Sequence, residues 1–273
     1  MKRIALLVVA AALSACGGGS SNNNISAAAN KTFSYGTAGQ ASLYQTSAVS
    51  SQLSSLSGAT SSTSSSSAQA AVGTSGVTGA LLTGSSLSYL SAASTAQALS
   101  VSGQALTAGA SFDNPACVTQ PTLTSVNFAN CTVTSTSTSF TDKLTVNGSF
   151  AVVGDLVTWN VTANFALSGS GVTENVVLKY SGNFTVTSAA IKGTSMADVN
   201  VSASGNGQSA TAEVSEAVVV DVTRDATGCI NGGTVEAKRV WVTRPNVQGT
   251  TFADQGARIT WTGCNTATIA FSN

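Results

Sequence analysis

The stretch Val157-Thr158-Trp159-Asn160-Val161-Thr162-Ala163-Asn164-Phe165-Ala166-Leu167 decides the fold class, because apolar side chains alternate along it with polar or small ones. Successive side chains of a β-strand point to opposite faces, so this period of two predicts a strand with one apolar and one polar face. An antiparallel sheet can keep one face in water while it buries the other. We therefore expect a sheet whose wet face is rich in Thr and Asn.

The same period continues on both sides of this stretch. Gly154-Asp155 separates it from an earlier alternation, and glycine-containing turns at 169–171 and 205–207 divide the later ones. The other alternations lie at residues 144–152, 176–186, 197–203, 210–222, 235–242, 257–261 and 267–271. The fold class is thus mainly β: residues 111–273 are expected to form an antiparallel meander of about eight to ten strands, as a curved sheet or partial barrel.

Residues 31–110 form an Ala/Ser-rich segment with a helical period. Within 38–56, side chains three or four apart share one helical face; they are Ala41, Tyr44, Ala48, Gln52 and Leu56. Residues 77–101 predict one or two further helices, and the low-complexity Ser/Thr run at 57–76 predicts a loop. Isolated helices of this length are marginal in water, so we expect them to pack on the apolar face of the sheet. The alternative is a sheet that closes on itself.

The N-terminus has the pattern of a secretory signal peptide. Lys2 and Arg3 precede an apolar run from Ile4 to Ala12, and small residues follow. The run has about ten residues, whereas a membrane-spanning helix needs about twenty. Residues 1–15 are therefore expected to be a signal peptide.

The quartet Leu13-Ser14-Ala15-Cys16 resembles the lipobox of bacterial lipoproteins. The resemblance implies cleavage before Cys16, lipid on its thiol and its amino terminus, and a lipid bilayer as the partner of the acylated residue. Gly17 follows where an inner-membrane retention signal would have Asp, which implies the outer membrane of the cell envelope. Residues 16–30, small and polar at their start, are expected to be a flexible tether. An ordinary cleavable signal, with Cys16 incidental, is the alternative.

Charge and composition exclude several classes of function. The chain has 11 basic and 11 acidic side chains and no histidine. There is no basic excess with which to bind nucleic acid. Without histidine, neither a Ser-His-Asp triad, a Cys-His dyad nor a histidine zinc site can form. We expect no enzymatic activity and no cofactor.

Four cysteines remain after Cys16: Cys117, Cys131, Cys229 and Cys264. An even number in an exported chain, without CxxC spacing, predicts two disulfides and no metal site. Three pairings are conceivable. We favour Cys117–Cys131 and Cys229–Cys264, because each pair lies within one local block of the chain.

Two groups of side chains are candidate functional sites. Carboxylates that might serve acid and nucleophile chemistry are Glu213, Glu216, Asp221 and Asp225. Glu213 and Glu216 should point to opposite faces of a strand. We favour the interpretation that all four carboxylates are surface charges. Residues 221–228 lack the ligand spacing of a calcium loop. Basic side chains near Trp241 and Trp261 could bind sugars or anions, although we favour arginines that guard sheet edges; they are Lys238, Arg239, Arg244 and Arg258.

The expected function is that of a non-enzymatic envelope lipoprotein whose sheet is a binding or structural module. If the helices leave the apolar face open, the side chains that would line a pocket for a lipid or other apolar ligand are Trp159, Phe165, Tyr180 and Phe184. The alternative is a surface-exposed adhesion or assembly component, which would use the Thr/Asn-rich face and the Ser-rich segment. A carboxylate-dependent enzyme is the least favoured hypothesis.

Overall fold

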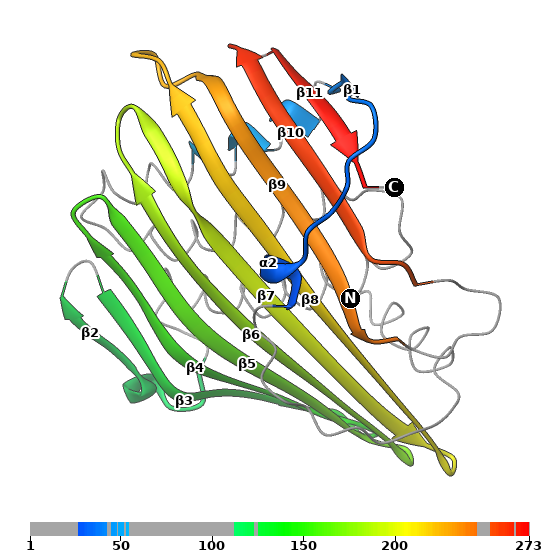
Figure 1. The fold of residues 1–273 in the computed structure, drawn as a ribbon. Helices are drawn as coiled ribbons and strands as arrows, with labels where there is room; N and C mark the ends of the chain where they lie inside the picture. The colour runs from blue at the N-terminus through cyan, green and yellow to red at the C-terminus, as the bar shows by residue number, and fades with distance from the viewer. Residues whose placement is uncertain are drawn as a thin grey trace.

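The computed structural model describes residues 27–42, 45–47, 49–51, 53–54, 112–122, 125–244, 252–264 and 266–272. Within these residues the chain is mainly β, with 11 strands in one antiparallel sheet. Consecutive strands from β2 to β11 are neighbours, as in a meander, and β1 adds to the outer side of β11. The sheet is twisted and open, with β1 and β2 at its two edges (Figure 1).

The strands lengthen toward the middle of the sheet. Their bounds are β1 (Gly39–Gln40), β2 (Val118–Thr122), β3 (Ser125–Thr136), β4 (Thr141–Val153), β5 (Leu156–Gly169), β6 (Val172–Val186), β7 (Ala190–Gly205), β8 (Gln208–Arg224), β9 (Ile230–Thr243), β10 (Gln255–Gly263) and β11 (Thr266–Phe271). Two short helices accompany them, α2 (Ala27–Asn30) and the 3-10 helix η1 (Pro115–Cys117). The expected class and meander order are confirmed.

The hairpin turns lie where the glycine-containing stretches predicted them. Gly154 lies between β4 and β5 with φ 59°, and Asn206 and Gly207 join β7 to β8 with φ 52° and 76°. Two-residue turns of this kind need positive φ, which Gly and Asn adopt most easily. The turns therefore set the register that keeps each apolar alternation on one side of the sheet.

The two faces of the sheet differ as the alternation predicted. We call the side that carries Val157, Trp159 and Val161 the apolar face, and the opposite side the polar face. Cross-strand partners keep this division from β3 to β11. The apolar face is buried over most of its length and forms one hydrophobic core. Burial of an aliphatic or aromatic side chain contributes about 1.5–3 kcal/mol, so this face dominates the stability of the sheet.

The N-terminal segment contacts both faces of the sheet. Helix α2 lies on the polar face, where the Ala28 N–H donates to Ser215 Oγ at 3.2 Å, and Figure 1 shows α2 on the viewer's side. The chain then pairs with β11 through β1 and a bridge between Tyr35 and Ser272. On the far side, the helical residues within 45–54 bring Val49 and Leu53 into the core of the apolar face.

This path differs in detail from the sequence expectation. The pattern over residues 38–56 predicts one helix, but Gly39–Gln40 is a strand, and the described helical residues of this range begin at 45. The buried helical positions are Thr46, Val49 and Leu53, which the pattern had not selected. Of the expected tether, only residues 27–30 are described, and they form α2. The expected signal peptide, the start of the tether, the loop at 57–76 and the apolar segment at 77–101 lie outside the described residues. None of the described helices has the length and apolar character needed to cross a membrane.

Candidate functional site

An aromatic cluster occupies the apolar face of β4, β5 and β6. The Trp159 ring stacks on Phe184, with centroids 5.6 Å apart, and on Phe150 at 6.4 Å, and it contacts Tyr180 at 5.4 Å. Gly182, the cross-strand partner of Trp159, gives the indole room, because a Cβ there would overlap the ring. The result is a close-packed group on the apolar face, between the middle of the sheet and its β2 edge.

Three of the four side chains considered for an apolar ligand belong to this core. Trp159, Tyr180 and Phe184 are at most 3 % exposed, and Phe165 is partly buried and packs against the hydrophobic core. They are covered side chains in this structure and not the lining of an open groove. A ligand would reach them only if their cover moved.

An ion pair lies on the same apolar face. Arg239 on β9 contacts Glu216 on β8 through Nη2 at 2.6 Å and Nε at 2.7 Å, and the side chains are 2 % and 7 % exposed. The two residues are direct cross-strand partners. The expectation that arginines guard sheet edges is therefore wrong for Arg239, and also for Arg258, since β9 and β10 are interior strands. The alternation predicts that Arg239 and Trp241 share one face, which puts a charge among apolar side chains. Glu216, on the same face of β8, supplies the opposite charge.

The candidate carboxylates do not form a catalytic group. Glu213 lies on the polar face and Glu216 on the apolar face, as their spacing predicted. Asp221 pairs with the exposed Lys192 at 3.0 Å, and Asp225 lies in the turn after β8. The structure thus places the four carboxylates in separate surroundings.

A polar cluster holds the N-terminal segment on the polar face of β9 and β10. Glu236 accepts a hydrogen bond from the Tyr35 hydroxyl and forms ion pairs with Arg258 at 3.3 Å and Lys238 at 3.5 Å. Arg258 also lies 4.3 Å over the Tyr35 ring, and Lys238 donates to the Lys31 carbonyl at 2.9 Å. Burial and the hydrogen bond to Glu236 raise the pKa of Tyr35. No periodic signal links residues about 200 positions apart, so the sequence could not reveal this cluster.

Asp198 is a buried carboxyl on the polar face of β7. It is 8 % exposed and shares a hydrogen bond with Ser215, whose oxygen also accepts from α2. Burial, with a contribution from Glu213, raises the pKa of Asp198 to about 6, while Ser215 and Lys179 partly offset the rise. The carboxyl therefore changes charge near neutral pH.

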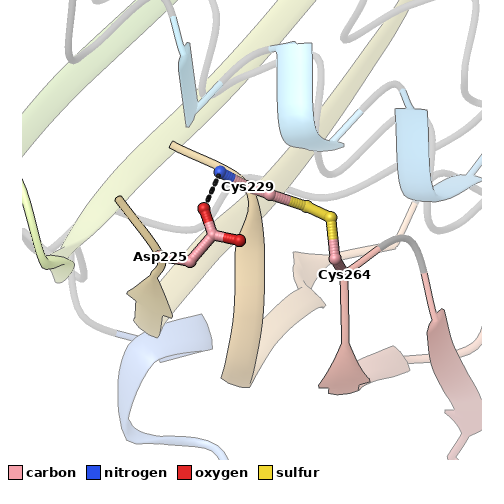
Figure 2. A group of neighbouring side chains, drawn as sticks. All are labelled: Asp225, Cys229 and Cys264. Atoms are coloured by element: carbon pink, nitrogen blue, oxygen red, sulfur yellow. Dashed lines mark hydrogen bonds between the residues drawn. A yellow bond between two sulfur atoms is a disulfide. The ribbon is translucent and has the colours of Figure 1, made fainter. Parts of the chain in front are cut away.

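The turn after β8 is tied to the turn after β10 by a disulfide. Figure 2 shows the Cys229–Cys264 bridge and Asp225 beside it. Asp225 Oδ1 accepts hydrogen bonds from Thr227 Oγ1, Thr227 N and Cys229 N, and these lower the pKa of the carboxyl. One carboxylate oxygen and two sulfurs lie within 4.8 Å of one another, but disulfide sulfurs are not thiolate ligands, so this group does not fit a metal.

Both disulfides have the favoured pairing. Cys117 at the end of η1 is joined to Cys131 on β3, 14 residues away, and Cys229 to Cys264, 35 residues away. In the chain-entropy model, loops of these lengths stabilise the fold by about 3 and about 4 kcal/mol. The cysteine pairing that the sequence favoured is therefore confirmed for both disulfides.

A cavity of about 110 Å³ opens beside the Cys229–Cys264 bridge. Leu53, Ile191 and Trp261 give it apolar walls, and Arg224 is the charged residue among its described lining. It lies at the end of the apolar face where the turns after β6, β8 and β10 meet. Sequence reasoning missed it, because its lining comes from separate parts of the chain.

Comparison with protein-family models, with curated proteins and with solved structures gave no match for this chain.

Proposed function

We propose that this chain is a lipid-anchored, non-enzymatic protein of the bacterial cell envelope whose sheet is a binding or structural module. The observation that carries the proposal is the quartet ending in Cys16 at the close of a short signal peptide. The two disulfides support it, since such bonds persist mainly in exported proteins. Gly17 favours the outer membrane.

The apolar face is the part of the sheet suited to a lipid or other apolar ligand. Its long strands carry a continuous core, which includes the Trp159 cluster on β4, β5 and β6. We propose that residues 31–110 cover this face, as Val49 and Leu53 do within the described residues. A ligand would then share or displace part of that cover.

The anchor would hold the sheet close to the bilayer. Ten residues separate Cys16 from Ala27, the first residue of α2. At about 3.5 Å per residue this link reaches at most about 40 Å. One acyl chain binds a membrane weakly, whereas several acyl chains on one residue hold firmly.

Replacing the anchor residue tests the proposal. We expect Cys16→Ser to leave the protein soluble or unprocessed when cell fractions are probed, because no thiol remains for lipid. The matched control is the pair Cys117→Ser with Cys131→Ser, which removes other cysteines and should stay in the membrane fraction. Cleaved Cys16→Ser protein in the membrane pellet would refute lipid anchoring.

A second candidate function is surface adhesion or assembly. One observation favours it: the β4–β5 hairpin tip presents apolar side chains to solvent, with Val153 72 % and Leu156 39 % exposed. Protease treatment of intact cells separates the two functions. Loss of the protein places it on the cell surface, and protection places it in the periplasm.

A further inference from the structure

The cavity beside Cys229–Cys264 combines a cation with apolar walls. Leu53, Ile191 and Trp261 are at most 3 % exposed, and Ile230 adds a fourth buried apolar side chain. Ser50 and Ser54, one helical turn apart, add hydroxyl groups. Ser54 is exposed, so solvent reaches the cavity from its side.

Arg224 is the charged group of this cavity. It is the last residue of β8, and its guanidinium donates to the Thr187 carbonyl in the turn after β6, which fixes the direction of the side chain. Burial lowers the pKa of Arg224, but the shift leaves the guanidinium charged at neutral pH. Ion pairs of a guanidinium are stronger when it is partly removed from water.

No carboxylate is among the described residues that line the cavity. Asp225 is the nearest in sequence, and its Oδ1 is already engaged with Thr227 and Cys229. The described lining therefore carries a net positive charge. The Cys229–Cys264 bridge keeps the two turns in place and limits how far the cavity can collapse.

We propose that this cavity binds the head of a carboxylate-headed apolar molecule. Arg224 would pair with the carboxylate, the Ser50 and Ser54 hydroxyls would donate to it, and the apolar walls would contact the first carbons of the chain. A dry cavity of about 150 Å³ holds a benzene-sized molecule, so about 110 Å³ fits the head and a few carbons. This inference rests on the proposed binding role of the apolar face and names the ligand class.

The test is a titration of the full chain carrying Cys16→Ser, which leaves every described residue unchanged. Calorimetry with hexanoate, hexanol and acetate separates the contributions of charge and chain. We expect hexanoate to bind at least tenfold more tightly than either of the others. Addition of 6-bromohexanoate should quench tryptophan fluorescence, and Trp261→Phe should remove most of that quenching.

Two variants with a matched control locate the site. Arg224→Gln should weaken hexanoate binding at least tenfold, whereas Arg258→Gln, on the polar face, should leave it unchanged. Ser54→Trp blocks the cavity from an exposed position and should abolish binding without unfolding the chain. Equal affinity for hexanoate and hexanol, or unchanged binding in Ser54→Trp, overturns the proposal.

A neutral apolar dye, N-phenyl-1-naphthylamine, separates failure of this site from failure of the binding role. Dye binding without hexanoate binding overturns the cavity proposal alone. Absence of both overturns the cavity proposal and the apolar-ligand role. Lipid anchoring is tested separately through Cys16.

Discussion

Single residues in this protein place charge where the alternation predicts apolar side chains. Glu216 shares a face with Val214 and Val218, and Arg239 with Ala237 and Trp241. Two opposite charges on the apolar positions of neighbouring strands could have been predicted as partners. The sequence could not give their register, because a β-bulge next to the turn shifts the pairing of β8 and β9 between Thr223 and Arg224.

The Glu216 and Arg239 side chains should be tolerated in the core only together, because each neutralises the charge of the other. We expect Glu216→Gln alone to lower the free energy of unfolding by about 3–5 kcal/mol, because it leaves a buried guanidinium without its counter-charge. The double variant Glu216→Leu with Arg239→Met should lie close to the wild type. Urea unfolding of Glu216→Leu, of Arg239→Met and of the double variant gives the coupling energy. A double variant as unstable as the sum of the single ones would contradict this account.

Asp198 should make stability depend on pH. Its pKa rises from 3.8 unfolded to about 6 folded, so between these values the folded chain binds more protons than the unfolded chain. The free energy of unfolding then falls as pH rises through this window. Asp198→Asn should therefore stabilise the protein at pH 8 by about 1–2 kcal/mol, a figure reduced for partial solvent screening, and have little effect near pH 3.5.

The control for Asp198 is Asp221→Asn, on the exposed ion pair with Lys192. Surface pairs of this kind contribute about 0–1 kcal/mol. Unfolding measured at both pH values should show a pH-dependent gain for Asp198→Asn only. A gain of the same size at pH 3.5 and pH 8 would mean that Asp198 is not the titrating group.

At the scale of elements, the long strands and hairpins were predictable and the N-terminal segment was not. Each strand from β4 to β11 carries its own period, and Gly or Asn marks several of the turns. By contrast, α2 has four residues and β1 has two, which is too short for any period. Their positions depend on side chains such as Ser215 and Glu236, far away in the sequence.

The docking of this segment on the polar face can be tested at Gly256 on β10. A Cβ at Gly256 would lie 2.9 Å from Phe33 Cγ and 3.0 Å from the Tyr35 hydroxyl, so Gly256→Val should displace the segment. Trypsin should then cleave after Lys31 several times faster than in the wild type, as followed by mass spectrometry. Gly39→Ala is the control, since nothing lies within 4 Å of its added Cβ. Equal cleavage rates would show that the segment is not held there.

At the scale of the whole molecule, the open sheet ends in two protected edges. Pro121 lies in β2 and cannot donate a backbone hydrogen bond, and β1 pairs with the outer side of β11. Such edges resist pairing with other chains. The alternation could predict the meander, but not whether the sheet would close, because closure depends on how strand twist and stagger accumulate across many pairs.

The N-terminal path connects this sheet to the proposed anchor. From Cys16 the chain reaches α2 on the polar face within about a dozen residues, pairs with β11, and then enters the core of the apolar face. The proposed membrane attachment and the cover of the apolar face are therefore parts of one continuous segment. The proposed export predicts that lipid anchoring and disulfide formation occur together in the mature protein.

The intact mass of the membrane-extracted protein, with and without reduction, tests the central claim most directly. We predict a mature chain that begins at Cys16, carries added acyl mass, and gains four hydrogens on reduction of its two disulfides. An unacylated chain whose mass does not change on reduction would contradict both the proposed lipid anchor and the proposed export.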